Sequence, residues 1–284
     1  MLGALQGTVT FLGTGTSMGV PTLGCNCTVC TSQDPHDRRL RPSLLVRWPS
    51  PENGQADGHL SGHYQPNERI VLIDTGPDFR QQALYAGIKH VDAVLYTHSH
   101  ADHIFGMDDL RPLSFVTYRQ SGPIPLYATA ETRTVLEHVY SYTFSPDAKY
   151  PTRARVAIKD IASETPIQVH EVVFTPIPVF HGELPITGYR FGNVAYMTDV
   201  STIPEESFAL LEGLDVLVLS ALRHTPHPSH ATLDQAVRWA NRIGARQTWF
   251  THISHDLGAA ETNANLPEGM ALAHDGLTLS VALA

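Results

Sequence analysis

Three histidines and one aspartate fall within the six residues from His98 to His103, directly after the apolar run 91–96. Such a run is typical of a buried strand, so the cluster lies where a strand gives way to a loop. Imidazole and carboxylate groups suit Zn²⁺, Mn²⁺ or Fe. On an extended backbone His98 and His100 point to the same side and can bind one ion, whereas Asp102 and His103, on the following turn, can bind a second. The spacing therefore predicts a site for two metals.

Four more polar residues each follow a short apolar segment that is typical of a strand: Asp74, His181, Asp199 and His252. Ligands at the ends of neighbouring strands converge at one edge of a sheet, whatever their separation in the sequence. We therefore expect these residues to join the cluster. Taken singly, Asp74 also fits a turn residue and Asp199 an Asx turn, and each histidine fits an ordinary structural or surface residue.

All three cysteines, Cys25, Cys27 and Cys30, lie in one short segment. A clustered odd number argues against a disulfide framework and favours metal ligation. A tetrahedral structural zinc needs a fourth ligand, and His255, three residues after His252, is the natural candidate. The alternatives are a redox or merely buried role for the cysteines, and a cap or surface role for His255.

The chain of 284 residues, with 42% hydrophobic and 17% charged residues, has the composition of a soluble globular protein. Its formal net charge of −9 argues against a large nucleic-acid interface, but permits a small phosphorylated substrate beside bound metals. No apolar run is long enough to span a bilayer, and residues 1–9 lack the pattern of a secretory signal. We therefore expect a cytoplasmic protein without a membrane partner.

Strand and helix patterns run along the chain with no linker between domains, so we expect a single domain over residues 1–284. Strands are predicted at 8–12, 43–48, 69–74, 91–96, 125–128, 170–176, 189–191, 195–198, 216–219, 247–251 and 277–283. Helices are predicted at 79–86, 130–140, 204–211 and 233–243. Residues 141–165 show no regular pattern, and 49–68 are expected to form a surface insertion. This order predicts two sheets facing each other with helices outside.

The ordered ligand motifs resemble those of the metallo-β-lactamase superfamily of hydrolases, over essentially the whole chain. The resemblance implies an α/β (α+β) fold, the αββα sandwich of two mixed β-sheets flanked by helices. It implies that Asp74 supports the site by hydrogen bonding, and it implies these ligand sets: His98, His100 and His181 for one metal; Asp102, His103 and His252 for the other; and Asp199 bridging both.

The Cys-x-Cys-x-x-Cys segment, with His255 at the end of a Thr-His-Ile-Ser-His segment, resembles the PhnP-type cyclic phosphodiesterase subfamily. This resemblance implies a structural zinc on Cys25, Cys27, Cys30 and His255, and a homodimer. It also marks His230, just before a helix whose N-terminus favours phosphate, as the residue that contacts the scissile phosphate and protonates the leaving oxygen. A solvated loop residue is the alternative. Nearby, His224 and His227 are expected to be loop residues, either of which could line the mouth of the pocket.

Together these implications predict a dinuclear metal hydrolase. A hydroxide bridging two Mn²⁺ or Zn²⁺ ions would cleave a small phosphodiester, with a cyclic ribosyl phosphate as the best single substrate. Two alternatives on the same fold stay open: an endonuclease like those that process the 3′ end of tRNA, and a thioester or lactam hydrolase. The acidic charge disfavours the first and the cysteine segment disfavours the second. A metal-binding module without turnover would be expected to lack a ligand.

Overall fold

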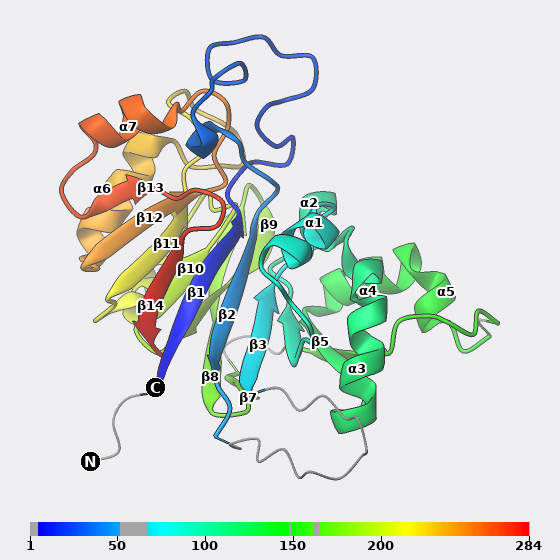
Figure 1. Cartoon of the computed structure of the whole chain (residues 1–284). Coiled ribbons are helices and arrows are strands. Elements are labelled where there is room, and N and C mark those ends of the chain that lie inside the picture. The colour runs from blue at the N-terminus through cyan, green and yellow to red at the C-terminus, as the bar shows by residue number, and fades with distance from the viewer. Residues whose placement is uncertain (1–4, 52–66, 148, 162–164, 284) are drawn as a thin grey trace.

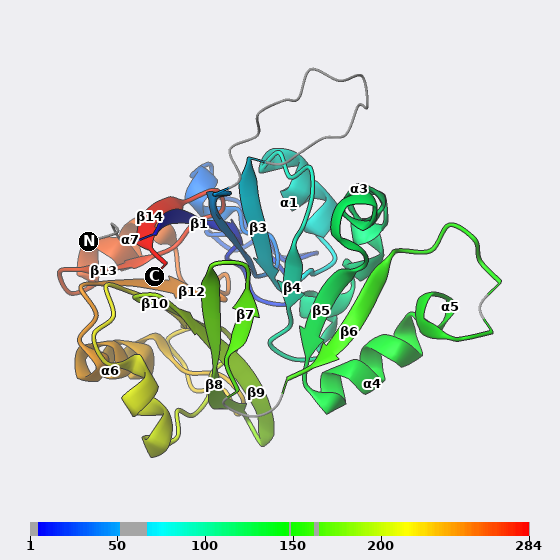
Figure 2. The same cartoon turned by 90° about the horizontal axis from the view of Figure 1, so that it is seen from below.

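The computed structural model describes residues 5–51, 67–147, 149–161 and 165–283. These residues form two seven-stranded sheets that pack face to face, with helices on the two outer sides (Figures 1 and 2). Each sheet is mixed, because part of it pairs antiparallel and the rest parallel. The αββα sandwich predicted from the sequence is therefore confirmed.

The first sheet has the strand order β14-β1-β2-β3-β4-β5-β6. Its strands are β1 (Gln6–Gly13), β2 (Ser43–Pro49), β3 (Glu68–Ile73), β4 (Ala93–Leu95), β5 (Ile124–Ala128), β6 (Val156–Asp160) and β14 (Thr278–Ala282). Strand β6 lies within residues 141–165, where no regular structure was expected. It is a five-residue strand at the sheet edge with no buried residue, so its sequence carries no clear alternation.

The second sheet has the strand order β13-β12-β11-β10-β9-β8-β7. Its strands are β7 (Ile167–Val169), β8 (Val172–His181), β9 (Leu184–Phe191), β10 (Val194–Met197), β11 (Val216–Ser220), β12 (Gln247–Thr251) and β13 (Met270–Leu272). Strands β9 and β10 are joined by a tight turn at Gly192 and Asn193, because Phe191 pairs with Val194. The predicted strand 170–176 overlaps β8 but begins two residues too early, because His170 has a φ of 50° and belongs to the turn before β8.

The helices are α1 (Phe79–Tyr85), α2 (Ala101–Ile104), α3 (Arg111–Ser121), α4 (Ala130–Val139), α5 (Ser141–Phe144), α6 (Leu233–Ile243) and α7 (Ala259–Asn265). Three 3-10 helices are η1 (Pro35–Asp37), η2 (Met107–Leu110) and η3 (Glu205–Leu211). The helix predicted at 204–211 is thus a 3-10 helix, and α5 lies in the stretch expected to be irregular. Helix α3 was not predicted, because its aromatic and β-branched residues blur the helical period.

The central strands of both sheets are buried on two faces, as an αββα sandwich requires. In β2, Leu44, Val46 and Trp48 face the second sheet, whereas Leu45 packs among the outer helices with Phe79. Alternate residues of one strand thus enter two different cores. Burial on both faces fixes the register, and with it the position at which each strand ends.

Most of the predicted insertion, residues 49–68, lies outside the described residues, which stop at Pro51 and resume at Asn67. Among the helices of the described ranges, none has the length and apolar character needed to cross a membrane.

Candidate metal centre

Three side chains of the candidate site come from strand ends at one edge of the sandwich. Asp74 follows β3, Asp199 lies two residues after β10, and His252 follows β12. All three have positive φ angles, of 65°, 60° and 55°. A non-glycine residue adopts this left-handed conformation at a cost, and such strain concentrates at functional sites. Each strand therefore ends in a sharp turn at the residue whose side chain enters the site.

Seven side chains form two groups whose ligand atoms lie within 4.8 Å of one another: His98, His100 and His181; and Asp102, His103, Asp199 and His252. Asp199 forms a further group of this kind with His181 and His230, so it lies between the two main groups. Helix α2 supplies Asp102 and His103, and β8 supplies His181 at its last residue. The structure thus brings together every residue that the sequence predicted for the dinuclear site.

Asp74 does not join either group, and instead organises the residues behind them. Its fully buried carboxylate accepts hydrogen bonds from Thr97 N and Thr97 Oγ1, each 2.8 Å long, and from His103 Nδ1 at 2.8 Å. Because Nδ1–H of His103 is engaged, its Nε2 presents a lone pair to the cluster. Sequence reasoning did not single out Thr97, although it directly precedes His98.

Hydrogen bonds select the same tautomer in two other histidines. His181 Nδ1 donates to the backbone oxygen of Ser229 at 2.6 Å, and His98 Nδ1 lies 3.0 Å from Thr97 Oγ1. Since Thr97 Oγ1 donates to Asp74, it can accept from His98. The Nε2 atoms of both imidazoles therefore remain available as ligands.

Buried nitrogen atoms without hydrogen bonds show that the cluster fits metal ions. Within the described residues, Nε2 of His98, His103 and His252 is buried and makes no hydrogen bond. His252 Nε2 lies 3.0 Å from Asp199 Oδ1, without hydrogen-bond geometry. Unpaired buried polar atoms are costly, so their presence in both ligand groups fits metal ions as partners. Divalent cations held by the two groups would satisfy these nitrogen atoms.

The buried charges of the His/Asp cluster also fit bound metal ions. Burial alone lowers the pKa of His103 and His252, but Asp102 and Asp199 outweigh it, raising the pKa of His103 well above its usual value and that of His252 to about 9. Burial raises the pKa of Asp199, but His252 and His103 bring it well below its usual range. The two buried carboxylates therefore require positive charge beside them, which bound metal ions supply.

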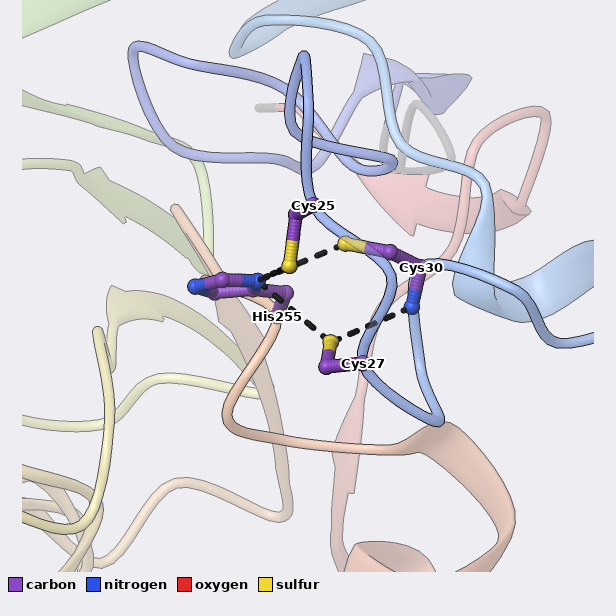
Figure 3. A group of neighbouring side chains, drawn as sticks. All are labelled: Cys25, Cys27, Cys30 and His255. Carbon is purple, nitrogen blue, oxygen red and sulfur yellow. Dashed lines mark hydrogen bonds between the residues drawn. The ribbon is translucent and has the colours of Figure 1, made fainter.

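The cysteine segment forms a second candidate metal site (Figure 3). The sulfur atoms of Cys25, Cys27 and Cys30 lie 3.2, 3.5 and 3.3 Å from Nδ1 of His255. One ring nitrogen cannot hydrogen-bond usefully to three thiols at once. In a tetrahedral zinc site, Zn–S and Zn–N bonds of about 2.3 and 2.0 Å place sulfur and nitrogen about 3.5 Å apart. The four side chains therefore have the spacing of a ZnS₃N site.

Ile253 connects the two candidate sites. Its N–H donates to the oxygen of Thr14 at 2.9 Å, and its oxygen accepts from Thr16 N at 3.0 Å. His252 on one side of Ile253 enters the dinuclear group, and His255 enters the cysteine group. The turn after β1, residues 13–17, is therefore hydrogen-bonded to the segment that carries candidate ligands of both sites.

His230 stands beside the dinuclear group, as predicted, just before helix α6 and its N-cap Thr232. Its ring is 4.4 Å from that of His181 and is stacked on His252 at 4.8 Å, and its Nδ1 lies 3.9 Å from Asp199 Oδ1. Burial and, next, the charge of His252 lower the pKa of His230 to about 3. Without a substrate anion beside it, His230 is therefore neutral at physiological pH.

The two neighbouring loop histidines differ in position. His224 is exposed, as expected of a loop residue. His227 is only partly exposed, and its ring centroid lies 5.0 Å from that of His230. It therefore adjoins the candidate site, a contact that depends on the folding of the loop and that the sequence did not distinguish from the position of His224.

Comparisons with known proteins agree with this geometry. A family model described as a beta-lactamase superfamily domain matches residues 69–253. A crystal structure described as a new diphosphatase from the PhnP family shares 50% sequence identity, covers 99% of both chains and has a TM-score of 0.86. The chain belongs to the PhnP family of this superfamily. The chain therefore has a hydrolase fold, and the predicted superfamily and PhnP family are confirmed.

Two curated relatives of this PhnP family member differ in coverage. An octanoyltransferase of Porphyromonas gingivalis is 35% identical over 268 residues, which include 94% of the chain but only 50% of the relative. The chain thus spans about half the length of that protein. A ribonuclease Z of Mycobacterium bovis is 28% identical, over 68% of the chain and 79% of the relative. The names octanoyltransferase and ribonuclease Z describe those two relatives.

Proposed function

We propose that this chain is a metal-dependent phosphodiesterase that hydrolyses a small phosphate ester or diphosphate. One observation carries the proposal. Asp199 of one ligand group lies close to His181 of the other, and a neutral histidine, His230, lies directly beside both residues. Such paired sites suit phosphoryl transfer, because two metal ions can stabilise both the attacking and the leaving oxygen. The diphosphatase neighbour in the PhnP family supports the same class of reaction.

The ligand sets proposed for the two ions are those predicted from the sequence. His98, His100 and His181 would hold one ion, Asp102, His103 and His252 the other, and Asp199 both. The imidazole and carboxylate donors accept Mn²⁺ or Zn²⁺. The three cysteines and His255 would hold a structural Zn²⁺. When bound, the two ions would supply an activated water and neutralise charge on the phosphoryl oxygens.

The protein residues contribute orientation and proton transfer. Asp74 and the Ser229 carbonyl hold the rings of His103 and His181 by their Nδ1–H groups. His230 would contact the phosphoryl group on the side of the leaving oxygen. An anionic phosphate beside this buried imidazole would raise its pKa and favour protonation, so His230 can then release a proton to the departing oxygen.

The substrate is proposed to be a small molecule. The net charge of −9 gives no support to a large nucleic-acid interface. A cyclic ribosyl phosphate is the specific substrate implied by the resemblance to the PhnP-type subfamily, and a diphosphate is the one implied by the structural neighbour. Both place an oxygen leaving group on a phosphorus atom, so the same residues would act on either.

The experiment is hydrolysis of bis(p-nitrophenyl) phosphate and of a five-membered cyclic phosphate, with Mn²⁺ or Zn²⁺ added and metal content measured in parallel. We expect metal-dependent cleavage and about three metals per chain: two in the paired His/Asp groups and one in the cysteine group. A thioester and a lactam serve as comparison substrates. The proposal would be contradicted if the fully metallated protein cleaved the thioester or the lactam but neither phosphate ester. It would also be contradicted if a tRNA precursor were the substrate that is cleaved and neither phosphate ester were.

A further inference from the structure

The backbone of Ser229 connects two histidines on opposite sides of one peptide segment. Its oxygen accepts the hydrogen bond of 2.6 Å from Nδ1 of His181, a predicted metal ligand. Its N–H donates to Nδ1 of His227 at 3.3 Å, and its hydroxyl lies equally far from the same atom. The position of His227 is therefore tied to a residue that also orients the metal site.

This contact determines which nitrogen of His227 carries its proton. A backbone N–H can only donate, so Nδ1 of His227 accepts. In the neutral ring the proton is then on Nε2, at the opposite edge. Within the described parts of the chain, nothing accepts a hydrogen bond from this Nε2–H. His227 thus presents a donor of defined orientation that other protein groups do not use.

The loop that carries His227 is braced, so the donor does not depend on a freely moving segment. Arg223 donates from Nε to the oxygen of Thr225 at 3.1 Å and from an Nη atom to that of Pro226 at 2.8 Å. The oxygen of Arg223 in turn accepts from Leu233 N, at the start of α6. Proline stands on both sides of His227, at 226 and 228, and limits the backbone further.

His227 lies behind His230 as seen from the predicted ligands, because His230 contacts those ligands and His227 contacts His230. His230 stacks on His252 and approaches Asp199, whereas the ring contact of His227 is to His230, at 5.0 Å. A phosphoryl group that touches both the ligand cluster and His230 would therefore leave His227 beside the next group of the substrate. A neutral N–H donor forms a strong, charge-assisted hydrogen bond to an anionic oxygen.

We propose that His227 is a positioning residue whose Nε2–H binds an oxygen of a second phosphoryl group, adjacent to the one that is cleaved. This inference rests on the proposed function and narrows it to diphosphate-linked substrates. In such a substrate, water adds across the P–O–P bridge, one P–O bond breaks, and the second phosphoryl group departs as a phosphate. His227 selects this substrate class over simple phosphodiesters by holding the departing group.

The test compares the inhibition constants of ADP and AMP, which differ by one phosphoryl group, against hydrolysis of bis(p-nitrophenyl) phosphate. The metallated full chain is used, with the activating metal in fixed excess. For the wild type we expect ADP to bind about tenfold more tightly than AMP, as one hydrogen bond to a charged group allows. His227→Phe should abolish this preference. His227→Gln, which can place an N–H near the position of Nε2, should restore part of it.

His224→Phe is the matched control, because it makes the same change at an exposed histidine of the same loop. It should leave both inhibition constants unchanged. Equal inhibition by ADP and AMP in an active wild type would overturn the inference. So would a loss in His227→Phe that affects ADP and AMP alike, or a His227→Gln variant with no restoration. If the wild type cleaves neither a phosphate ester nor a diphosphate with any metal, the proposed function itself fails, which is a distinct result.

Discussion

At the scale of single residues, the candidate site depends on which nitrogen of each imidazole is free. Asp74 engages Nδ1 of His103, and the Ser229 carbonyl engages Nδ1 of His181. Both contacts turn the Nε2 lone pair to the cluster, so the rings are oriented before any metal binds. Burial raises the pKa of Asp74 above its usual value and outweighs the charge of His103 and the three hydrogen bonds from His103 and Thr97, which act in the opposite direction.

Asp74→Asn tests this orientation without changing the size of the side chain. An amide has only one acceptor oxygen, so it cannot accept from Thr97 N, Thr97 Oγ1 and His103 Nδ1 as the carboxylate does. We expect metal affinity to fall about 10- to 100-fold. Competition with a chelator, followed by metal analysis, measures the change. Unaltered affinity in a folded variant would show that Asp74 does not support the site.

His230→Ala tests proton transfer to the leaving oxygen. We expect the metals to stay bound, and kcat to fall about 10²- to 10⁴-fold for a substrate with an alkoxide leaving group, such as the cyclic phosphate. The loss should be smaller for bis(p-nitrophenyl) phosphate, because p-nitrophenolate departs without a proton. Metal analysis and kcat for both substrates provide the check, with His224→Ala as control. An equal loss for both substrates would contradict the acid role.

At the scale of elements, strand ends and one loop carry the residues of the two candidate sites. Residues 74, 199 and 252 turn sharply at the ends of β3, β10 and β12, whose neighbours fix their position in each sheet. The cysteine segment lies in the long connection between β1 and β2 and has little regular structure of its own. Contacts of its three sulfurs with His255 therefore do much to hold it against the body of the protein.

Cys27→Ala tests whether the cysteine segment is held in place by a structural zinc. Removing one thiolate leaves three ligands, so we expect about one zinc fewer per chain and a lower melting temperature, because metal binding to the folded state contributes to stability. The dinuclear site should stay chemically competent. Metal analysis and thermal unfolding give the readouts, with Thr28→Ala in the same segment as control. Normal zinc content and stability in Cys27→Ala would exclude the structural-zinc role.

At the scale of the whole molecule, the two sheets are also joined at an ion-pair cluster that no predicted motif indicated. Asp92, just before β4 in the first sheet, accepts from His170 Nε2 of the second sheet at 3.1 Å and from Ile70 N at 2.6 Å. His90 also lies within 3.4 Å of this carboxylate. Burial raises the pKa of Asp92, but the hydrogen bonds from His170, His90 and Ile70 outweigh it and leave that pKa below its usual value.

Asp92→Asn should therefore destabilise the protein in a pH-dependent way. A depressed pKa in the folded state stabilises the fold above the unfolded pKa, about 4, and this contribution disappears as the pH falls through the folded value. We expect a loss of about 1–3 kcal/mol in unfolding free energy at pH 7 that shrinks below pH 4. Urea unfolding at several pH values measures it. Asp215→Asn, at an exposed ion pair, should change little. A pH-independent difference would refute the assignment.

The sequence by itself determined the candidate ligands and their approximate placement. The spacing from His98 to His103, and apolar segments before Asp74, Asp199 and His252, predict ligands at strand ends, because both signals are local. Predicted strands such as 247–251 match β12 for the same reason. Short or edge elements such as β6 lack that periodicity, and their existence depends on neighbouring strands.

Only the tertiary structure decided how distant residues meet. The Asp74–His103 hydrogen bond, the convergence of the cysteines on His255, and the contact of His170 with Asp92 each join segments that are far apart in the chain. His224 and His227 look alike as loop residues, yet only His227 adjoins His230. Such contacts depend on sheet order and register, which arise from packing of the whole sandwich, whereas sequence periodicity reports only local burial.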